Sequence, residues 1–414
     1  MKTHPKLKII NDPIYGFITI PNKLVFDLME HKYFQRLRRI TQMGFSYIVY
    51  PGAHHTRFHH ALGAMFLMQK AVQTLQSKDV NISEKEEEAL YVAILLHDIG
   101  HGPFSHAMEN SIVENVGHEQ ISLLFMEALN RKFNKQLTLA IQIFKDEYPR
   151  KFLHQLISGQ LDMDRLDYLK RDSFYTGVPE GTVNAQRLIA MLNVKDDALV
   201  VEEKGIYSVE NFIVARRLMY WQVYLHKTGI VAEQLLVRLL IRAKQLSAQG
   251  IELPASEGLQ FFLNNSISLE DFSEEVLNTF STLDDYDIIS AMKAWVGNDD
   301  FVLKNLSKML LYRDLLKVKV KSQPFSLQKI EEKRNILSSA FKLSDEEASF
   351  FVFTGKLENQ AYSMEKDTIN LLRKNGKIVD VAKASDQLNL EALSKSVVKY
   401  YICYPKNNTH NYRD

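Results

Sequence analysis

The sequence predicts a mainly α-helical protein that carries a few short β-hairpins. Apolar residues recur at helical spacing along much of the chain, for example in residues 23–43 and 209–247. Strand patterns are shorter and fewer, and the clearest of them lie at residues 7–21 and 198–209. The composition is that of a globular protein, because 46% of the 414 residues are hydrophobic and 24% are charged.

The N-terminal elements follow from their turn residues and their periodicity. In residues 7–21, β-branched residues lie around an Asn-Asp-Pro turn and a glycine, which predicts a hairpin. Residues 23–43 place Leu, Phe and Ile side chains near one face, which predicts an amphipathic helix. Residues 44–56 contain Gly44, Pro51 and Gly52, and we expect them to form a loop.

The helix with the clearest start begins after Ser83. Ser83 and Glu86 form the pattern of a capping box, and the acidic residues around them suit the positive end of a helix. The helix continues as an apolar run to His97, and we expect Gly100 and Pro103 to end it.

The remaining patterns predict two regions. Polar residues that could carry chemistry are dense before residue 230, which predicts a catalytic core over residues 1–245. We expect residues 246–414 to be an α+β accessory region for packing, oligomerisation or regulation. Further helical patterns occupy residues 105–115, 118–133, 161–171, 184–193, 268–280, 285–297, 300–314 and 344–353. Strand patterns occupy residues 378–383 and 397–404.

Charge and cysteine usage exclude several classes of protein. The formal net charge is only +1, so the overall charge gives no indication of nucleic-acid binding, which stays uncertain. Any site for an anion must therefore be a local cluster of positive charge. The single cysteine, Cys403, excludes a disulfide framework and a cysteine zinc site, and it fits a reducing cytoplasm. Because no apolar run reaches about 18 residues, we expect no membrane span.

A histidine and an aspartate, His97 and Asp98, end the apolar helix. Burying an imidazole and a carboxylate there is costly unless they are paired or bind a metal, although a polar last turn is the simpler interpretation. Further acid, base and ligand candidates follow shortly after, and they are His101, His106, Glu109 and His118. On a helix, His106 and Glu109 would share a face.

Two other sets of polar residues form stripes at helical spacing. The first set is Asp164, Arg165, Tyr168 and Asp172, and the second is Arg216, Tyr220, Tyr224 and Lys227. The first could be a solvated ionic face, and the second could be an aromatic ridge that faces the core. The alternative for the second set is a wall for an aromatic base, with cations for phosphate.

A cluster of four histidines occupies residues 54–60, at His54, His55, His59 and His60. Imidazole and carboxylate groups together are a usual ligand set for a hydrolytic metal ion. Because cysteine ligands are absent, a metal site here would use histidine and aspartate. The residues alone do not tell which of the four histidines would bind it.

These motifs resemble the HD-superfamily dNTP triphosphohydrolases, including the catalytic domain of the mammalian member that also has a SAM domain. The matching stretches cover roughly residues 8–235. They are NDPIYG, FQRLRRITQMG, YPGAHHTRFHHALG, LLHDIGHGPFSH, GHEQIS, LDMDRLDYLKRDS and YLHK. The resemblance implies an HD-domain helical core with short β-hairpins, followed by the α+β accessory region.

The resemblance implies a metal site and an acid/base pair. The family motif Arg-Phe-X-His maps onto residues 57–60 and leaves His59 at a variable position. The implied metal ligands are His60, His97, Asp98 and Asp164, for one or two divalent ions that could be Fe, Mn, Zn, Ni or Mg. The implied acid/base residue is His106, oriented by Glu109, and His101 and His118 map onto histidines that face the phosphates.

The resemblance also implies contacts to the substrate. Gln42 and Asp172 match residues that hold the sugar 3′-hydroxyl, and Tyr224 matches a residue that crowds a 2′-hydroxyl and so favours deoxyribose. Tyr220 stands where the mammalian member has a histidine, which puts the base and sugar contacts in doubt. The full implied set is Gln42, Arg57, Arg165, Tyr168, Asp172, Arg216, Tyr220 and Tyr224.

The mammalian member is activated by nucleotides bound at tetramer interfaces, and part of that site has counterparts here. The matching residues are Lys8, Asn11, Gln35, Arg38, Lys204, His226 and Lys227. Glu202 stands where the mammalian member has an arginine. The resemblance therefore leaves nucleotide activation open, and it implies a homo-oligomer, either a dimer or a tetramer.

The implied reaction converts a dNTP and water to a deoxynucleoside and triphosphate. A hydroxide activated by the metal would attack the α-phosphorus. One alternative is an HD phosphohydrolase that acts on a nucleoside monophosphate, a dinucleoside polyphosphate, a cyclic nucleotide or another phosphate ester. Another is a nucleotide- or nucleic-acid-binding protein with little catalysis.

Overall fold

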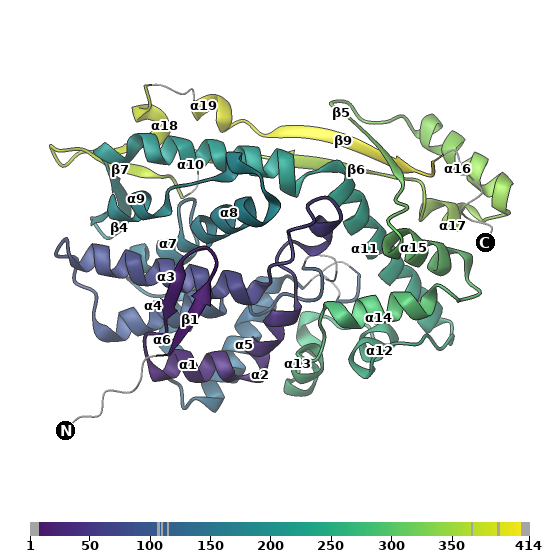
Figure 1. The fold of residues 1–414 in the computed structure, drawn as a ribbon, viewed down its shortest axis with the longest axis horizontal. Helices are drawn as coiled ribbons and strands as arrows, with labels where there is room; N and C mark the ends of the chain where they lie inside the picture. The colour runs from purple at the N-terminus through teal and green to yellow at the C-terminus, as the bar shows by residue number, and fades with distance from the viewer. Residues whose placement is uncertain are drawn as a thin grey trace.

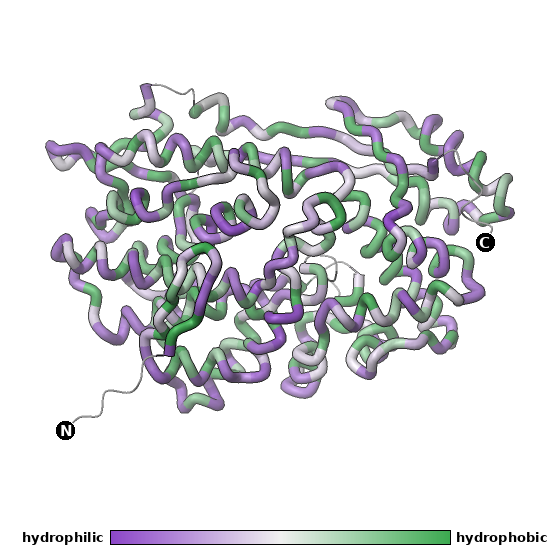
Figure 2. Tube along the Cα trace, viewed as in Figure 1, coloured by the Kyte–Doolittle hydropathy of each residue, from purple (hydrophilic) through white to green (hydrophobic). Residues whose placement is uncertain are grey.

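The structure, a computed structural model, describes residues 8–105, 108, 111–113, 116–365, 367–386 and 390–406. Helices dominate it and the strands are short (Figure 1), so the mainly α-helical prediction is confirmed. Hydrophobic and hydrophilic residues intermix along most of the helices (Figure 2), as expected for amphipathic helices around a shared core. Within these described residues, no helix is long and apolar enough to cross a membrane.

The N-terminal hairpin is confirmed. Strand β1 (Ile9–Asp12) pairs antiparallel with β2 (Gly16–Thr19), with Ile9 opposite Thr19. The Asp12 side chain accepts hydrogen bonds from the backbone N–H groups of Ile14 and Tyr15, at 2.9 and 3.0 Å. This carboxylate therefore stabilises the turn that the Asn-Asp-Pro motif predicts.

The single helix expected over residues 23–43 is wrong, because the chain turns twice there. Helix α1 (Lys23–Glu30) ends at His31, and the His31 ring accepts the N–H of Tyr33 to start α2 (Lys32–Gln35). A 3-10 turn, η1 (Arg36–Arg39), follows directly. The expected loop at 44–56 begins with another 3-10 turn, η2 (Gly44–Ile48).

The helices of the N-terminal half surround two long buried ones. The capping-box helix is confirmed as α4 (Glu84–Leu96), in which Ser83 and Glu86 make the two reciprocal bonds. It packs against α3 (Arg57–Gln76). The other helices here are α5 (His118–Lys132), α6 (Thr138–Phe144), α7 (Lys151–Ile157), α8 (Met163–Thr176), η3 (Pro179–Gly181), α9 (Ala185–Ala190) and η4 (Glu203–Gly205).

The helix expected over residues 209–247 is two helices. Helix α10 (Ile206–Met219) passes into a π-helical turn, η5 (Tyr220–Tyr224), and the chain restarts as α11 (Lys227–Ala248). The His226 side chain caps α11 by accepting the N–H of Thr228 at 3.3 Å. Such π turns are rare and often occur at functional sites.

Residues 105–115 were expected to be helical, and where the structure describes them they are not. Met108, Ser111 and Ile112 form turns, and Val113 makes a parallel bridge to Ile267. Ser105 and its neighbour Phe104 have positive φ angles of 60° and 51°. A right-handed α-helix cannot include residues in this conformation.

The C-terminal half combines short helices with the strands of two small sheets, one of which also includes two strands of the N-terminal half. Strands β3 (Leu192–Lys195), β4 (Ala198–Glu202), β7 (Asn370–Leu372) and β8 (Ile378–Asp380) form one sheet, in which β4 and β7 are parallel. Strands β5 (Lys317–Lys321), β9 (Val397–Tyr404) and β6 (Phe353–Asn359) form the other. The helices are α12 (Glu257–Asn264), η6 (Leu269–Asp271), α13 (Glu274–Phe280), α14 (Asp285–Trp295), α15 (Phe301–Leu311), α16 (Leu327–Phe341), α17 (Asp345–Ser349), α18 (Val381–Ala384) and α19 (Leu390–Leu393).

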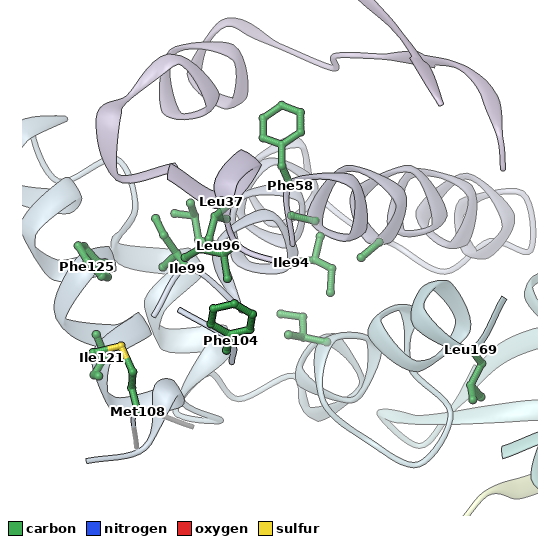
Figure 3. Packing of buried hydrophobic residues seen from close by; sticks show 14 of the residues in the cluster. Leu37, Phe58, Ile94, Leu96, Ile99, Phe104, Met108, Ile121, Phe125 and Leu169 are labelled. Carbon is green, nitrogen blue, oxygen red and sulfur yellow. The ribbon is translucent and has the colours of Figure 1, made fainter. Parts of the chain in front are cut away.

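One apolar core runs through both predicted regions. Leu37, Leu96 and Ile99 are fully buried and lie together beside the loop that follows α4 (Figure 3). Trp295 of α14 is also fully buried, and its indole N–H donates to the carbonyl of Pro254 at 3.0 Å. The division at residue 245 stays a prediction, since α11 runs through that position and strand β7 extends the sheet of β3 and β4.

Candidate metal centre and substrate pocket

Three packed helices bring together the four side chains expected to bind a metal. His60 lies in the first turn of α3, His97 and Asp98 directly follow α4, and Asp164 lies in the first turn of α8. Helix α3 packs against both α4 and α8. The donors therefore come from helix ends that converge in space although they are far apart in the sequence.

The donor atoms of these residues lie close to one another. His60 Nε2 is 3.0 Å from Asp164 Oδ1 and 3.3 Å from His97 Nε2, and His97 Nε2 is 3.5 Å from Asp164 Oδ1. Asp98 lies at the side of this group, with Oδ1 3.5 Å from His97 Nε2 and Oδ2 3.8 Å from His60 Nε2. His60, His97 and Asp164 thus form one group of candidate metal donors, and the adjacent Asp98 forms a second group with His101 and His118.

The second nitrogen of each imidazole is held from outside the cluster. His60 Nδ1 lies 2.7 Å from Asp167 Oδ2, and His97 Nδ1 lies 2.7 Å from the carbonyl oxygen of Ile94. Because each Nδ1 donates its hydrogen to an oxygen, each neutral ring would direct the lone pair of its Nε2 inward. This is the arrangement in which histidine binds metal ions.

Asp167 belongs to a fully buried ion network that sequence reasoning missed. Arg171 donates to both oxygens of Asp167, at 2.9 and 3.0 Å, and also to Asp12 at 2.8 Å. Both Asp167 and Arg171 are completely buried. Asp167 is three residues after Asp164, so the spacing could have suggested it, but the stripe considered there includes neither Asp167 nor Arg171.

The charges of the cluster favour a bound cation. Burial opposes the charge on His60, but hydrogen bonds to Asp164 and Asp167 raise the pKa of its imidazole to about 10. Burial also opposes ionisation of Asp164, yet hydrogen bonds from His60 and His97 hold its pKa well below the ordinary value. A divalent ion can replace these protons and leave neutral imidazoles. The donor set, its inward direction and its charge therefore fit the predicted ion.

His59 does not join the cluster, because it caps helix α3. Its Nδ1 lies 2.9 Å from Thr56 Oγ1 and accepts the backbone N–H of Thr56 at 3.2 Å. His54 lies apart as well, with its ring stacked on Tyr47 at a centroid distance of 4.9 Å. The four histidines of residues 54–60 therefore have different surroundings, and only His60 reaches the donors.

A second group of polar side chains lies beside Asp98. Arg57 donates through Nη1 to Asp98 and through Nη2 to Ser105 Oγ, the latter at 2.7 Å. His101 Nδ1 is 3.4 Å from Asp98 Oδ1, and the His101 ring stacks on His118 at a centroid distance of 3.8 Å. The structure thus places these two histidines next to the candidate metal centre.

A cavity of about 500 Å³ opens over these groups. This volume is within the range of small-molecule pockets. Its lining includes most of the residues implied for substrate and catalysis, namely Gln42, Arg57, Asp98, His101, His118, Asp164, Arg165, Tyr168, Asp172, Tyr220 and Tyr224. Arg216 is not part of this lining, and its guanidinium lies 5.9 Å from the Tyr220 ring centroid. His106 and Glu109 lie outside the described residues.

One end of the cavity is built around Asp172. Tyr224 donates its hydroxyl to Asp172 Oδ2 at 2.8 Å, and His55 Nε2 lies 2.6 Å from Asp172 Oδ1. His55 is buried and stacks on the Tyr175 ring at a centroid distance of 4.4 Å. The role of His55 was missed because its partner is 117 residues away in the sequence.

Three arginines at or near the cavity have spare hydrogen-bond donors. Among the described residues, the Nε atoms of Arg57, Arg165 and Arg216 are buried without a hydrogen-bond partner, as is Oε1 of Gln42. Buried polar atoms are seldom left unpaired in proteins. These atoms have almost no exposed surface, and similar unpaired atoms occur away from the cavity, for example in Ser338 and Asn359, so they do not by themselves indicate a ligand.

The residues implied for an activating nucleotide lie mostly on the surface. Lys8 Nζ is 4.0 Å from the Phe26 ring centroid, and the Arg38 guanidinium is 3.6 Å from that of Phe58. Arg38 also donates to Gln35 at 2.9 Å, and Asn11 is exposed on the hairpin. Glu202, which stands where the mammalian member has an arginine, is paired with Lys78 at 2.6 Å and Lys204 at 2.7 Å. Nucleotide activation stays a prediction.

The family model of the HD domain matches residues 57–172, and that of the HD associated region matches residues 183–254. The uncharacterized protein YwfO of Bacillus subtilis is 31% identical over 96% of this chain and 92% of its own length. A deoxynucleoside triphosphate triphosphohydrolase SAMHD1 homolog of Dictyostelium discoideum is 31% identical over 63% of this chain, which spans 54% of that relative.

The fold also matches a solved structure along nearly its whole length. A phosphohydrolase from Bacteroides thetaiotaomicron is 53% identical, with a TM-score of 0.94. The match covers 97% of this chain and 100% of the crystallised chain. The likeness therefore extends to the C-terminal region, beyond the part that the two family models match.

Proposed function

Because the chain belongs to the HD-domain phosphohydrolase family, we propose that it is a divalent-metal-dependent hydrolase of deoxynucleoside triphosphates. The products would be the deoxynucleoside and inorganic triphosphate. The observation that carries the proposal is the convergence of His60, His97, Asp98 and Asp164 at a cavity that Arg57 and Arg165 also line. The similarity to a deoxynucleoside triphosphate triphosphohydrolase supports this choice of substrate.

His60, His97, Asp98 and Asp164 would hold the ion. A divalent ion lowers the pKa of a water molecule to near neutrality and neutralises charge on a phosphoryl group. Asp167 and the carbonyl of Ile94 fix the two imidazole rings so that the site is organised before substrate arrives.

The triphosphate would lie along the basic side of the cavity. Arg57 and Arg165 line this cavity, and arginine suits phosphate because its planar donors bind two oxygens at once. His101 and His118 lie next to Asp98 and can supply further donors. The proposed general acid, His106 with Glu109, remains an assignment by resemblance.

The deoxyribose would lie at the Asp172 end. Asp172 is positioned by His55 and Tyr224, and its acceptor oxygens suit a sugar hydroxyl. Gln42 also lines this cavity. The Tyr224 ring, fixed by its bond to Asp172, would leave no room for a 2′-hydroxyl.

A substrate panel tests this proposal. The purified protein would be incubated with each of the four dNTPs, singly and mixed, with Fe, Mn, Zn, Ni or Mg, and the phosphate products would be resolved by ³¹P NMR. Release of triphosphate, lost in the Asp98→Ala variant, supports the proposal. Release of orthophosphate or pyrophosphate, or turnover of monophosphates or cyclic nucleotides alone, would assign the site to another phosphohydrolase reaction.

Mixing the nucleotides tests regulation in the same experiment. Activity only in mixtures would indicate an activating nucleotide at the surface around Lys8, Asn11, Gln35 and Arg38. Light scattering with and without nucleotide would show whether the protein forms the expected dimer or tetramer. Turnover of single dNTPs by a protein of unchanged mass would contradict activation by assembly.

A further inference from the structure

Asp285, the first residue of α14, reaches from the C-terminal region to the wall of the substrate cavity. It is only 6% exposed. Its Oδ1 accepts the backbone N–H of Phe104 at 2.7 Å, and its Oδ2 accepts both the N–H and the hydroxyl of Thr41, at 2.9 and 2.7 Å. One carboxylate therefore ties together two segments that are 63 residues apart.

Both of these segments carry pocket residues. Thr41 precedes Gln42, and Phe104 and Ser105 line the cavity themselves. Phe104 and Ser105 have left-handed backbone conformations, with φ of 51° and 60°, which are strained for residues other than glycine. Such a turn persists only when its surroundings hold it, and the bond from the Phe104 N–H to Asp285 is a buried anchor of this kind.

The anchored turn leads on to the groups proposed for catalysis. Ser105 Oγ accepts the Nη2 hydrogen of Arg57 at 2.7 Å and lies 3.3 Å from the carbonyl oxygen of Thr41, to which it donates. Arg57 also donates to Asp98. Asp285 is therefore linked to this group through Thr41, which bonds to Asp285 and accepts the hydroxyl of Ser105. Ser105 in turn holds Arg57, which donates to Asp98.

We propose that Asp285 is a positioning residue of the active site, supplied by the C-terminal region. It fixes the Phe104–Ser105 turn, so that Ser105 directs the Arg57 guanidinium toward the phosphates of the substrate. The proposal rests on the proposed function, because it takes Arg57 to be a phosphate contact. It also gives part of the C-terminal region a role in catalysis.

The neighbouring Asp284 is a matched control. It is 7% exposed and caps α14 by accepting the N–H of Tyr286 at 3.0 Å. Its side chain also accepts the N–H of Asp287 in a capping box and pairs with Arg39, whose side chain is 46% exposed. Neither Asp284 nor Arg39 lines the cavity. Loss of either carboxylate removes buried hydrogen bonds from the same end of α14. Only Asp285 is linked to Arg57, through Thr41 and Ser105.

The experiment compares Asp285→Asn with Asp284→Asn. An asparagine is nearly isosteric with aspartate, but its NH₂ group would face either the Phe104 N–H or the Thr41 N–H, so one anchor is lost. We expect Asp285→Asn to lower kcat/KM per folded molecule about 10- to 100-fold, the loss that misplacement by about 1 Å can cause. Asp284→Asn should stay within about twofold at a comparable loss of melting temperature.

A second readout does not depend on turnover. Binding of inorganic tripolyphosphate to the metal-free protein, measured by calorimetry in EDTA, should weaken roughly tenfold in Asp285→Asn and not in Asp284→Asn. Thr41→Val removes only the hydroxyl bond and serves if Asp285→Asn does not fold, with an expected loss of about threefold. Equal effects of the two aspartate variants, or unchanged binding and turnover in Asp285→Asn and Thr41→Val, overturn the proposal. If the wild type hydrolyses no dNTP, the proposed function fails while the binding comparison still decides the role of Asp285.

Discussion

A methyl group at Gly63 should displace the buried ion pair of Asp167 and Arg171, which lies behind the candidate metal centre. Gly63 lies on α3, three residues after His60, and α3 packs against α8 at this point. A Cβ atom there would lie 2.0 Å from Asp167 Oδ1, 2.2 Å from Arg171 Nη2 and 2.7 Å from Asp167 Cγ. Both neighbours are fully buried and hydrogen-bonded, so neither can move away freely.

The magnitude of the effect follows from three terms. Replacing glycine by alanine inside a helix contributes a gain of about 1 kcal/mol. Overpacking costs about 1–3 kcal/mol, and separating a buried pair costs about 3–5 kcal/mol when the partners lose each other. Because Arg171 keeps Asp12 as a partner, we expect the pair to be displaced rather than lost, for a net destabilisation of about 2–4 kcal/mol.

Urea denaturation of Gly63→Ala, with Gln73→Ala as the control, measures this cost. Gln73 is exposed on the same helix, and its replacement should change the free energy of unfolding by less than about 0.5 kcal/mol. Displacing Asp167 also frees the His60 ring, so metal affinity should fall about 10- to 100-fold. A Gly63→Ala protein as stable as the wild type, with unchanged metal affinity, would refute the close packing of this network behind His60.

Three further predictions concern single side chains. Asp167→Asn should weaken metal binding about 10- to 100-fold, measured by competition with a chelator, and unchanged affinity would mean that Asp167 does not orient His60. Tyr224→Ala should raise the ratio of kcat/KM for a ribonucleotide to that for the matching deoxyribonucleotide at least about tenfold, and a constant ratio would contradict the role of its ring. Burial raises the pKa of Asp285 to about 6, so the folded protein holds a proton that the unfolded chain has released. The free energy of unfolding of the wild type relative to Asp285→Asn should therefore decrease by on the order of 3 kcal/mol as the pH rises from about 4 to 7. Urea unfolding at several pH values measures this difference, and the same pH dependence in both proteins would contradict the prediction.

The sequence predicts local structure best where the signal is local. The capping box at Ser83 and Glu86, the N-terminal hairpin and the strand at residues 397–404 are each determined by residues within a few positions. The breaks at His31 and His226 were missed because a histidine that caps a helix has no distinctive pattern in the sequence. The helical spacing of apolar residues continues across both breaks, so it predicts one helix where the structure has two.

In the candidate site, too, the sequence predicts motif residues better than contacts between distant segments. The resemblance names His60, His97, Asp98 and Asp164, and the structure brings them together, but their role as ligands stays a prediction. The residues that orient the site were not foreseen, because their contacts depend on how distant segments pack. His55 meets Asp172 and Asp285 meets Phe104 across 117 and 181 residues.

The most direct test of the metal centre is the metal content of His60→Ala compared with His59→Ala. Both variants remove an imidazole from the first turn of α3, but only His60 faces the other donors, whereas His59 caps the helix. Inductively coupled plasma mass spectrometry on the purified proteins should find the wild-type amount of metal per chain in His59→Ala and a loss of most of it in His60→Ala. Full metal content in a folded His60→Ala protein would contradict the proposed ligand set, and with it the mechanism proposed for this active site.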